Sequence, residues 1–471
     1  MSKKYPNIVP AGDKTQSLGT SEKRWAEVHA GTIEGEDFAG GLAEIIDSLA
    51  TKTALAEVEG KIGTASAPLY FTLDTPFTAS GKRAIKTPNI LWLNINGKGH
   101  KLTSALAFDI DTAANWDLKA TAWSKNTSYT AGDYVTPTDE QGVYCYKATT
   151  TGTTSTTLMP EWPQEVGKTV NDGEVVWECC TNPANPANRA GKDFYLYAIY
   201  STADVVPRFI FSANSTVPEG YDADTTRKIC GFHCLCVDVG TIDGHALTGY
   251  MAGDILPASV WDLYHRPKSE PESMAYDSFS DTWLDIYGDS WDGKKLVSVY
   301  GGVWADGSSA KKWHGEATLE QLMSQGKRLP WRHEFQMAAK GSNEQTNIKG
   351  SADPNTTGGH VDTSGRRMVS NIGLEDCCGV LWQWLMDLGF AGGSGWTDSA
   401  YNSGVDSRSY GQTYGNLFRL LGGGNWASGA SCGSRAAVCD HVSARVAAPC
   451  GCRGASEPLH SKSDIRTPLY A

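Results

Sequence analysis

Residues 422–454 read GGGNWASGASCGSRAAVCDHVSARVAAPCGCRG, and the two ends of this stretch do not resemble its middle. The ends are rich in glycine and carry one tryptophan and one arginine, which are residue types of a fixed framework. The middle, AAVCDHVSARVAAPC, shows neither the 3.6-residue period of an amphipathic helix nor the alternation of a half-buried strand. The stretch therefore predicts a rigid frame around side chains that were not selected for packing.

Composition favours a turn-rich, β-dominated binding protein of the extracellular type. The 471 residues leave room for several domains and include 51 glycines, 16 tryptophans and 19 tyrosines. The net charge is −12, and no cluster of lysine or arginine interrupts it. A nucleic-acid surface needs a basic stripe to neutralise phosphates, so we expect no nucleic-acid partner.

The sequence predicts neither membrane insertion nor a disulfide framework. The N-terminus, MSKKYPNIVPAGDK, has no apolar core of a signal peptide, and no run of 18 apolar residues occurs. The 12 cysteines come largely in adjacent or near pairs, which rarely bridge each other, so free buried thiols are expected. CGFHCLC (230–236) has zinc-binding residue types, but no second cluster has matching spacing.

The first segment, 1–38, contains SLGTSEKRWAEVHAGTI (17–33). This run resembles a short motif near the start of phage tail-fibre proteins, which implies attachment to other phage tail proteins. The alternative is a loop anchored by Trp25. In residues 39–66, apolar residues recur about every three or four positions, which predicts a helix with an apolar seam. The residues of this seam are Leu42, Ile45, Ile46, Leu49, Leu55, Val58 and Ile62. We expect a coiled-coil homotrimer, with packing onto the chain itself as the alternative.

Strand patterns at 67–118 and again at 184–225 predict one discontinuous β-domain, into which residues 119–183 are inserted. The insert resembles small β-modules related to chitin-binding domains, which implies sugar stacking on exposed rings. The aromatic residues that carry this prediction are Trp123, Tyr129, Trp162 and Trp177. The alternative is that these rings form the core of a small domain.

The last segment, 226–471, contains GKRLPW (326–331), CCGVLWQWLMDLG (377–389), LFRLLGGGNW (417–426) and GCRG (451–454), in that order. This series is similar to the C-type-lectin fold of the formylglycine-generating-enzyme type. The catalytic members of that family bind copper with two cysteines after the Gly-Gly-Ser-Trp motif. The equivalent positions here are Ser428 and Gly433, and Cys432 stands alone, so we do not expect oxidase activity.

A closer resemblance is to the variable proteins of diversity-generating retroelements displayed by phages. It rests on the bracket around the patternless run. The framework residues of this bracket are Gly423, Gly424, Trp426, Gly429, Cys432, Gly433, Ser434, Arg435, Gly451, Arg453 and Gly454. In such proteins adenines of a template are copied with random substitution. Randomising the first two bases of an Asn codon never yields Lys, Glu, Gln, Met or Trp, and residues 427–450 contain none of the five.

The resemblance implies a phage receptor-binding protein at the tip of the virion tail fibre, with a bacterial surface protein or glycan as its partner. The expected binding face consists of Ala427, Ser428, Ser431, Ala436, Val438, Asp440, His441, Val442, Arg445, Val446 and Ala448. We expect six of these side chains to be largely exposed and to cluster on one face, namely Ala436, Val438, Asp440, His441, Val442 and Arg445. We also expect Trp426 and Trp384 to be buried, and Arg435 and Arg453 to clamp backbone or carboxylate oxygens.

Besides the oxidase, one other enzymatic function is an alternative. A tail-associated depolymerase would use carboxylate pairs such as Glu375/Asp376 or Asp285/Asp289, although nothing in the sequence shows that they converge on a cleft. No cofactor is expected. A structural Ca²⁺ in the lectin-like domain stays open, although no run of oxygen ligands has the spacing of a calcium loop.

Overall fold

The computed structural model describes residues 71–73, 75–137, 142–200, 206–390, 395–398, 412–415 and 417–460. The chain divides into two units, Met1–Pro68 and Leu69–Ala471. All described residues belong to the second unit. The expected attachment segment (1–38) and coiled-coil helix (39–66) therefore lie outside the described residues.

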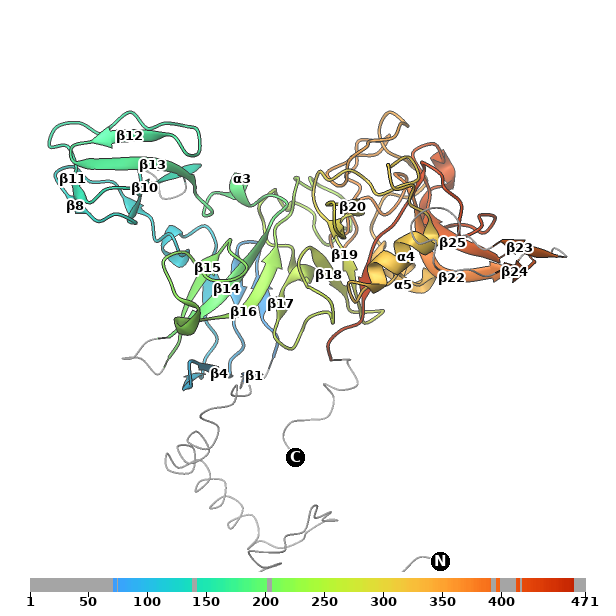
Figure 1. Ribbon diagram of the computed structural model, residues 1–471, viewed down its shortest axis with the longest axis horizontal. Coiled ribbons are helices and arrows are strands. Elements are labelled where there is room, and N and C mark those ends of the chain that lie inside the picture. Colours follow the sequence, from blue (N-terminus) through green and yellow to red (C-terminus); the bar gives the residue numbers. More distant parts are fainter. Residues whose placement is uncertain are drawn as a thin grey trace, which may run out of the picture. The chain divides into compact units, whose positions relative to one another are not determined.

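Strands dominate the described residues, and the helices are few and short (Figure 1). This confirms the prediction of a β-rich fold. No helix among these residues is long and apolar enough to cross a membrane. The helices are α3 (Pro186–Arg189), α4 (Gly315–Met323) and α5 (Arg332–Ala338), with 3-10 turns at Ala113–Asn115, Ala223–Thr225, Pro257–Ser259 and Gly429–Ser431.

The first part of the described chain is a β-domain of three sheets, ordered β1-β4-β5, β2-β3-β6 and β15-β14-β16-β17. One hydrophobic core joins Phe77 and Trp116 to Phe194 and Phe211, so two segments separated in sequence share it. The strands are β1 (Phe71–Leu73), β2 (Thr78–Ser80), β3 (Ala84–Lys86), β4 (Leu91–Ile95), β5 (Lys98–Leu102), β6 (Ala107–Asp109), β14 (Asp193–Ile199), β15 (Arg208–Ser212), β16 (Thr226–His233) and β17 (Trp261–Asp262).

The expected boundary of this domain at residue 225 is too early. Strand β16 pairs with β14 along its length, from Asp193 opposite His233 to Ile199 opposite Thr226, and β17 pairs with β16 in turn. Backbone hydrogen bonds of a central strand must be satisfied within its sheet. The β-domain therefore extends to Asp262.

The insert forms its own small β-module between β6 and β14. It has a five-stranded sheet ordered β12-β13-β10-β9-β7 and a two-stranded sheet of β11 and β8. Its core of Tyr146, Val175, Trp177 and neighbours is separate from that of the β-domain. The strands are β7 (Thr121–Ala122), β8 (Ser128–Tyr129), β9 (Tyr134–Thr136), β10 (Tyr144–Ala148), β11 (Gly152–Thr153), β12 (Thr169–Asp172) and β13 (Val175–Thr181).

The C-terminal part contains short strand pairs around one four-stranded sheet ordered β26-β25-β22-β27. Strand β28 returns to pair with β19, so the end of the described chain closes onto an early strand of this domain. The strands are β18 (Met274–Asp277), β19 (Thr282–Asp285), β20 (Asp289–Trp291), β21 (Leu296–Ser298), β22 (Trp382–Phe390), β23 (Trp396–Asp398), β24 (Gln412–Tyr414), β25 (Leu417–Gly423), β26 (Gly433–Val438), β27 (Cys450–Gly451) and β28 (Ala455–Ser456).

Helix α5 is fixed against this domain by a buried ion pair. Arg328 donates to both oxygens of Glu334 at 2.7 Å, and Thr282 donates to the same carboxylate at 3.0 Å. Glu334 also accepts the backbone N–H of Trp331 at 2.8 Å, which caps the first turn of α5. The pairing with Arg328 helps hold the pKa of Glu334 below its usual range, against the effect of burial. The GKRLPW motif thus anchors α5 beside the sheet of β22 and β25.

Candidate functional site

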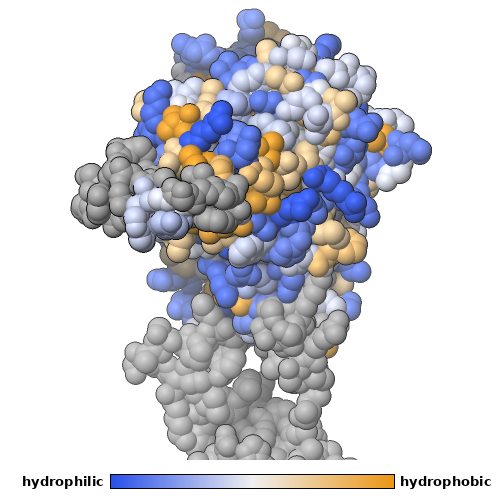
Figure 2. Space-filling model, turned by 90° about the vertical axis from the view of Figure 1, so that its right-hand side faces the viewer, coloured by the Kyte–Doolittle hydropathy of each residue, from blue (hydrophilic) through white to orange (hydrophobic). Residues whose placement is uncertain are grey.

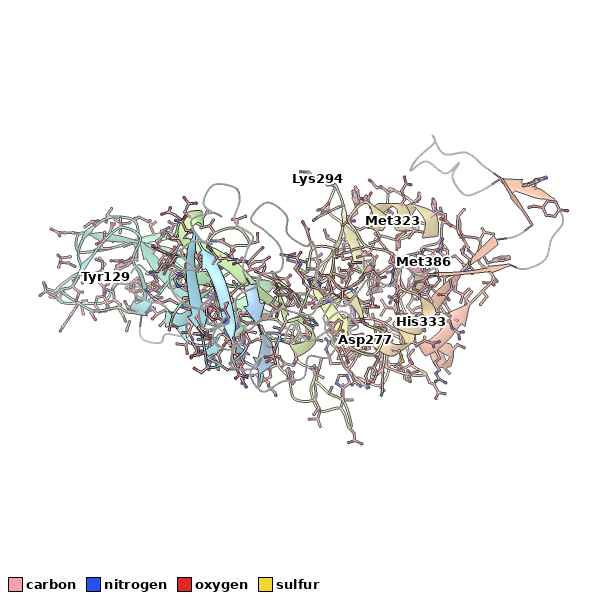
Figure 3. The ribbon with its side chains drawn as sticks, turned by 90° about the horizontal axis from the view of Figure 1, so that it is seen from below. Tyr129, Asp277, Lys294, Met323, His333 and Met386 are labelled. Carbon is pink, nitrogen blue, oxygen red and sulfur yellow. The ribbon has the colours of Figure 1, made fainter. Side chains whose placement is uncertain are left out.

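Residues 427–449 contain β26, which forms one edge of the β26-β25-β22-β27 sheet, and then lead to β27 at the opposite edge. The sheet has a core on each side. Trp384 and Leu421 pack with Trp313 on one side, and Leu385 packs with Phe335 of α5 on the other. Figure 3 shows the side chains that fill this region, with Met386 on β22 and Met323 on α4. A sheet packed on both faces is a rigid platform for an edge segment.

Glycines bracket the entry to the segment because the backbone there has no room for a side chain. Gly423 has φ +90°, and a Cβ built on it would lie 2.3 Å from the carbonyl oxygen of Cys377. Gly424 has φ +91° and would place a Cβ 2.8 Å from the Cys432 sulfur. At Gly433 a Cβ would lie 2.2 Å from an oxygen of Glu344. Gly423 and Gly424 are therefore required by their positive φ and by close neighbours, as the frame prediction implies. At Gly433 the neighbour is the end of a flexible side chain, which leaves room for adjustment.

Glu344 was missed by the sequence reasoning, and it fixes the start of β26. Its carboxylate accepts the Ser434 hydroxyl at 2.6 Å and the Ser434 backbone N–H at 3.1 Å. The next residue, Gln345, donates its backbone N–H to the carbonyl oxygen of Cys432 at 2.9 Å. The only signal was its place in SNEQTNIKG, a run that adds to the family resemblance.

Arg453 closes the exit of the bracket. Its guanidinium is fully buried and donates to the carbonyl oxygens of Asp285, Ile286 and Glu375 and to the side-chain oxygen of Gln383. The bonds to Ile286 and Gln383 measure 2.6 and 3.1 Å. This is the clamp expected for Arg453, and it ties the end of the variable stretch to β19 and β22.

Two framework predictions need correction. Arg435 is exposed, and its side chain makes no recorded hydrogen bond or ion pair within the described part of the chain, so it is not a clamp. It lies on β26, an edge strand of its sheet, and projects to solvent. Trp426 is half-buried rather than buried, packing beside Val380 while its backbone N–H donates to the Val380 carbonyl oxygen at 2.9 Å. Trp384 is fully buried, as expected.

None of the predicted binding residues is buried, but only some are exposed. The half-buried group contains Ser428, Ala436, Val438, His441 and Ala448. The exposed group contains Ala427, Ser431, Asp440, Val442, Arg445 and Val446.

The half-buried group has a structural cause that the patternless sequence concealed. Val438 lies opposite Leu421 in the β25–β26 pairing and packs against the core that contains Trp384. Ser428 belongs to a turn in which its hydroxyl donates to Asn425 at 2.6 Å. The expectation of large exposure is therefore wrong for Ala436, Val438 and His441, of which the first two lie in strand β26.

The exposed part of the segment is the loop after β26, and it is held at its base. Phe418 bridges to Val442, and the backbone N–H of Arg419 donates to the His441 carbonyl oxygen at 3.1 Å. The N–H of Arg445 donates to the Val442 carbonyl oxygen at 2.8 Å. The loop backbone is therefore fixed while its side chains are presented to solvent.

This loop offers a small, mixed surface. Val442 is 44% exposed and Val446 41%. The Asp440 carboxylate and the His441 ring are hydrogen-bonded at the surface. Arg445 adds a positive charge. Figure 2 shows hydrophobic side chains gathered among hydrophilic ones on this side of the molecule.

The chemistry of the two enzymatic alternatives is not assembled here. Cys432 is buried, and burial raises the pKa of its thiol to about 11, so a reactive thiolate is disfavoured. Glu375 is buried against Arg367, and Asp376 against His360, at 2.7 and 2.8 Å. Both carboxylates are therefore engaged by basic side chains within the protein.

The second carboxylate pair is equally internal. Asp285 accepts from Lys327 at 2.6 Å, and Cys452 donates to Asp289 at 3.2 Å. Burial, with Asp285 beside it, raises the pKa of Asp289 well above its usual range. Both carboxyl groups are fully buried.

No group of three potential metal ligands occurs among the described residues. The cysteines of CGFHCLC divide between two cores, Cys230 and Cys234 in one and Cys236 in the other. Burial raises the pKa of all three thiols. They pack as small apolar side chains.

The rings of the inserted module form its core, which is the alternative weighed against sugar stacking. Trp177 and Tyr129 are buried, and Trp123 and Trp162 pack half-buried against the same cluster. Asp172 accepts from the indole N–H of Trp123 at 2.8 Å and from that of Trp177 at 3.1 Å. Stacking of a sugar on an exposed face of Trp177 is therefore excluded by its burial.

A glycine-framed surface loop held on a β-rich platform is the arrangement of binding proteins that present loops on a rigid scaffold. Comparisons with known proteins extend this class. Residues 163–262 match the family described as Mtd second domain, a match that ends at the last residue of β17. The chain is 32% identical over 296 residues to the tail fiber receptor-binding protein of Bordetella phage BPP-1, covering 57% of this chain and 72% of that protein.

The chain therefore belongs to the family of phage tail fibre proteins that this relative represents. Solved structures agree in fold. The Major Tropism Determinant U1 variant superposes with a TM-score of 0.56 at 24% identity, over 82% of this chain and 85% of that one. The M1 variant gives a TM-score of 0.56 at 23% identity, over 83% and 85%. The recognition of a phage tail-fibre variable protein from its bracket motif is confirmed.

Proposed function

We propose that this chain attaches a phage virion to a receptor on the bacterial surface, and that the loop after β26 makes the contact. The observation that carries the proposal is the combination of a buried clamp at Arg453 with exposed side chains in the loop. The family relative is a tail fiber receptor-binding protein, which supports the same function here.

The contact surface is centred on Asp440, Val442, Arg445 and Val446. Binding loops on a rigid scaffold tolerate changes in exposed side chains because the fold does not depend on them. Val438 lies outside the freely variable set because it packs on Trp384. Diversification by a retroelement would then be tolerated best in the loop and least in β26.

The surface is small and has no phenylalanine, tyrosine or tryptophan among residues 427–449, so a single copy binds weakly. Several copies on one fibre would compensate, because linked sites raise the effective concentration. We therefore propose a homotrimer joined through the apolar seam of residues 39–66, with residues 1–38 attached to other tail proteins. The C-terminal domain would adopt the C-type-lectin fold of the formylglycine-generating-enzyme type and stand at the tip of the fibre.

The proposal is tested by competition. Purified full chain is incubated with host cells before phage is added, and free phage is counted. Adsorption should fall as the protein concentration rises, and it should recover when the same protein carries a scrambled 439–446 loop. If saturating protein leaves adsorption unchanged, the chain does not bind the receptor.

Sedimentation of the same sample at micromolar concentration tests the proposed homotrimer. A monomer at that concentration would contradict it.

A further inference from the structure

The N-terminus of helix α4 packs closely against the loop after β26. A Cβ built on Gly315, the first residue of α4, would lie 3.1 Å from the carbonyl oxygen of Ser443, a buried residue of this loop. Gly307, which precedes α4, approaches the loop further along, where a Cβ would lie 2.3 Å from the backbone nitrogen of Ala447. Both approaches meet backbone atoms of the loop, so they do not depend on which side chains the loop carries.

His314 joins the helix to the loop through both nitrogens of its ring. The ring is buried, and its Nδ1 accepts the backbone N–H of Ala317 at 3.4 Å, which caps the first turn of α4. On the other side, the ring hydrogen-bonds to the backbone of Ser443. Because Nδ1 is an acceptor, Nε2 carries the proton and donates it to the Ser443 carbonyl oxygen. One imidazole therefore connects the helix cap to the loop backbone.

The groups around His314 favour this neutral ring. Burial lowers the pKa of His314 below its usual range, against the opposing effects of Glu316 and of the bond to Ser443. Glu316 is itself engaged by Arg419 of β25 at 3.0 Å. The backbone N–H of Arg419 donates to the carbonyl oxygen of His441 at 3.1 Å. Helix α4 and strand β25 therefore hold the loop at two nearby backbone positions, His441 and Ser443.

We propose that His314 is a positioning residue for receptor recognition, because its bond to Ser443 fixes the path of the loop that presents Val442 and Arg445. This inference rests on the proposed function of the loop, and it names a constant residue outside the variable stretch on which that function depends. A loop that samples other paths presents the binding arrangement only part of the time, and its affinity falls by that fraction.

Two substitutions separate the two bonds of the ring. His314→Asn keeps an acceptor at the cap, where asparagine is among the best residues, but its side chain ends closer to the backbone than Nε2 and does not reach Ser443. His314→Gln has the length to donate an amide N–H to Ser443, but glutamine is not a favoured cap. A role in folding alone would make receptor binding follow stability in both variants, whereas a positioning role separates the two properties.

The readout is the concentration of purified full chain that halves phage adsorption to host cells, measured beside thermal melting. His314→Asn should melt near the parent and require about three to ten times more protein, as expected for the loss of roughly one hydrogen bond. His314→Gln should melt at a lower temperature than the parent and inhibit adsorption like the parent.

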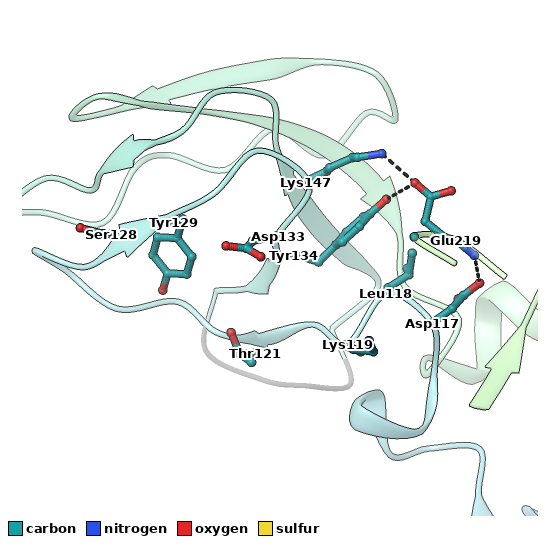
Figure 4. Close-up of a pocket in the computed structure, with 12 residues that line it drawn as sticks. Asp117, Leu118, Lys119, Thr121, Ser128, Tyr129, Asp133, Tyr134, Lys147 and Glu219 are labelled. Atoms are coloured by element: carbon teal, nitrogen blue, oxygen red, sulfur yellow. Dashed lines mark hydrogen bonds and ion pairs between the residues drawn. The ribbon is translucent and has the colours of Figure 1, made fainter. Parts of the chain in front are cut away.

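Glu219→Gln is the control for the loss of a polar contact elsewhere in the chain. Glu219 joins the inserted module to the β-domain, since its carboxylate pairs with Lys147 at 2.8 Å and its backbone N–H donates to Asp117 at 2.8 Å (Figure 4). This variant should inhibit adsorption like the parent.

A chain with a scrambled 439–446 loop shows which idea fails. If this chain inhibits like the parent, the proposed function of the loop is wrong, and the role of His314 falls with it. If scrambling abolishes inhibition but His314→Asn inhibits like the parent, the loop binds the receptor and His314 does not position it. Inhibition that follows melting temperature in both His314 variants would also overturn the inference.

Discussion

Arg453→Leu should destabilise the C-terminal domain strongly, whereas Arg435→Leu should not. Both arginines belong to the framework expected from sequence, and both flank the same segment. Arg453 is fully buried and holds three carbonyl oxygens and the Gln383 side chain. Arg435 is exposed. The comparison therefore measures the clamp with the residue type held constant.

The magnitude follows from the acceptors left behind. A buried acceptor without a donor costs about 1–3 kcal/mol. The carbonyl oxygen of Ile286 also accepts from Glu375, so it keeps one partner. The three acceptors that depend more on Arg453 then give a loss of about 3–9 kcal/mol, which is a large share of a stability of about 5–15 kcal/mol. For a domain of this size, even a loss of about 3 kcal/mol corresponds to a fall in Tm of roughly 6–12 °C.

Scanning calorimetry of both variants beside the parent chain checks this prediction. Arg435→Leu should stay within about 0.5 kcal/mol of the parent, as exposed substitutions usually do. Near-ultraviolet circular dichroism assigns the transition, because the C-terminal cores contain several buried tryptophans. Equal Tm values for the two variants would refute the clamp.

Two further predictions use other parts of the fold. Val438→Asp should lower the free energy of unfolding by about 2 kcal/mol, because it places a charge against the core that contains Trp384. Val442→Asp, at an exposed site, should change that free energy by no more than about 0.5 kcal/mol. Urea unfolding of both variants measures the difference. Burial lowers the pKa of His265 from 6.5 to about 4, so the folded state favours the neutral ring. The stability that His265 contributes is therefore complete above pH 6.5 and is lost as the pH falls toward 4. His265→Phe, which keeps the ring contacts with Tyr276 and Trp283, should flatten that part of the pH profile of Tm, and an unchanged slope between pH 6.5 and 4 would contradict this account.

The sequence alone identified the frame better than the surface. Glycines that the fold cannot replace, such as Gly423 and Gly424, are recognisable in the sequence because three consecutive glycines stand just before Trp426. Arg453 was predicted as a clamp because its motif closes the bracket. Which acceptors it holds could not be predicted, since they come from β19 and β22, far away in sequence.

The surface was harder to predict because exposure is a property of pairing. Val438 and Val442 look equivalent in the sequence, yet the first faces Leu421 across the β25–β26 pairing and the second projects from a loop. The domain boundary near residue 225 failed for a related reason, since β16 is defined by its partner β14 rather than by its own pattern.

The aromatic residues of the inserted module illustrate the same limit. Composition cannot tell a ring that meets solvent from a ring that fills a small core. The Asp172 carboxylate, which joins the indoles of Trp123 and Trp177, marks them as core residues only once the module is folded.

The central claim is that the loop after β26 recognises the receptor while the frame maintains the fold. The most direct test replaces Asp440, Val442, Arg445 and Val446 with alanine together in the phage, and measures adsorption to host cells beside thermal melting of the same purified variant. Stability should change by less than about 2 kcal/mol in total, because all four side chains are exposed. Adsorption should be abolished or redirected to another host. A variant that melts like the parent and also adsorbs like the parent would contradict the account and place the receptor site elsewhere.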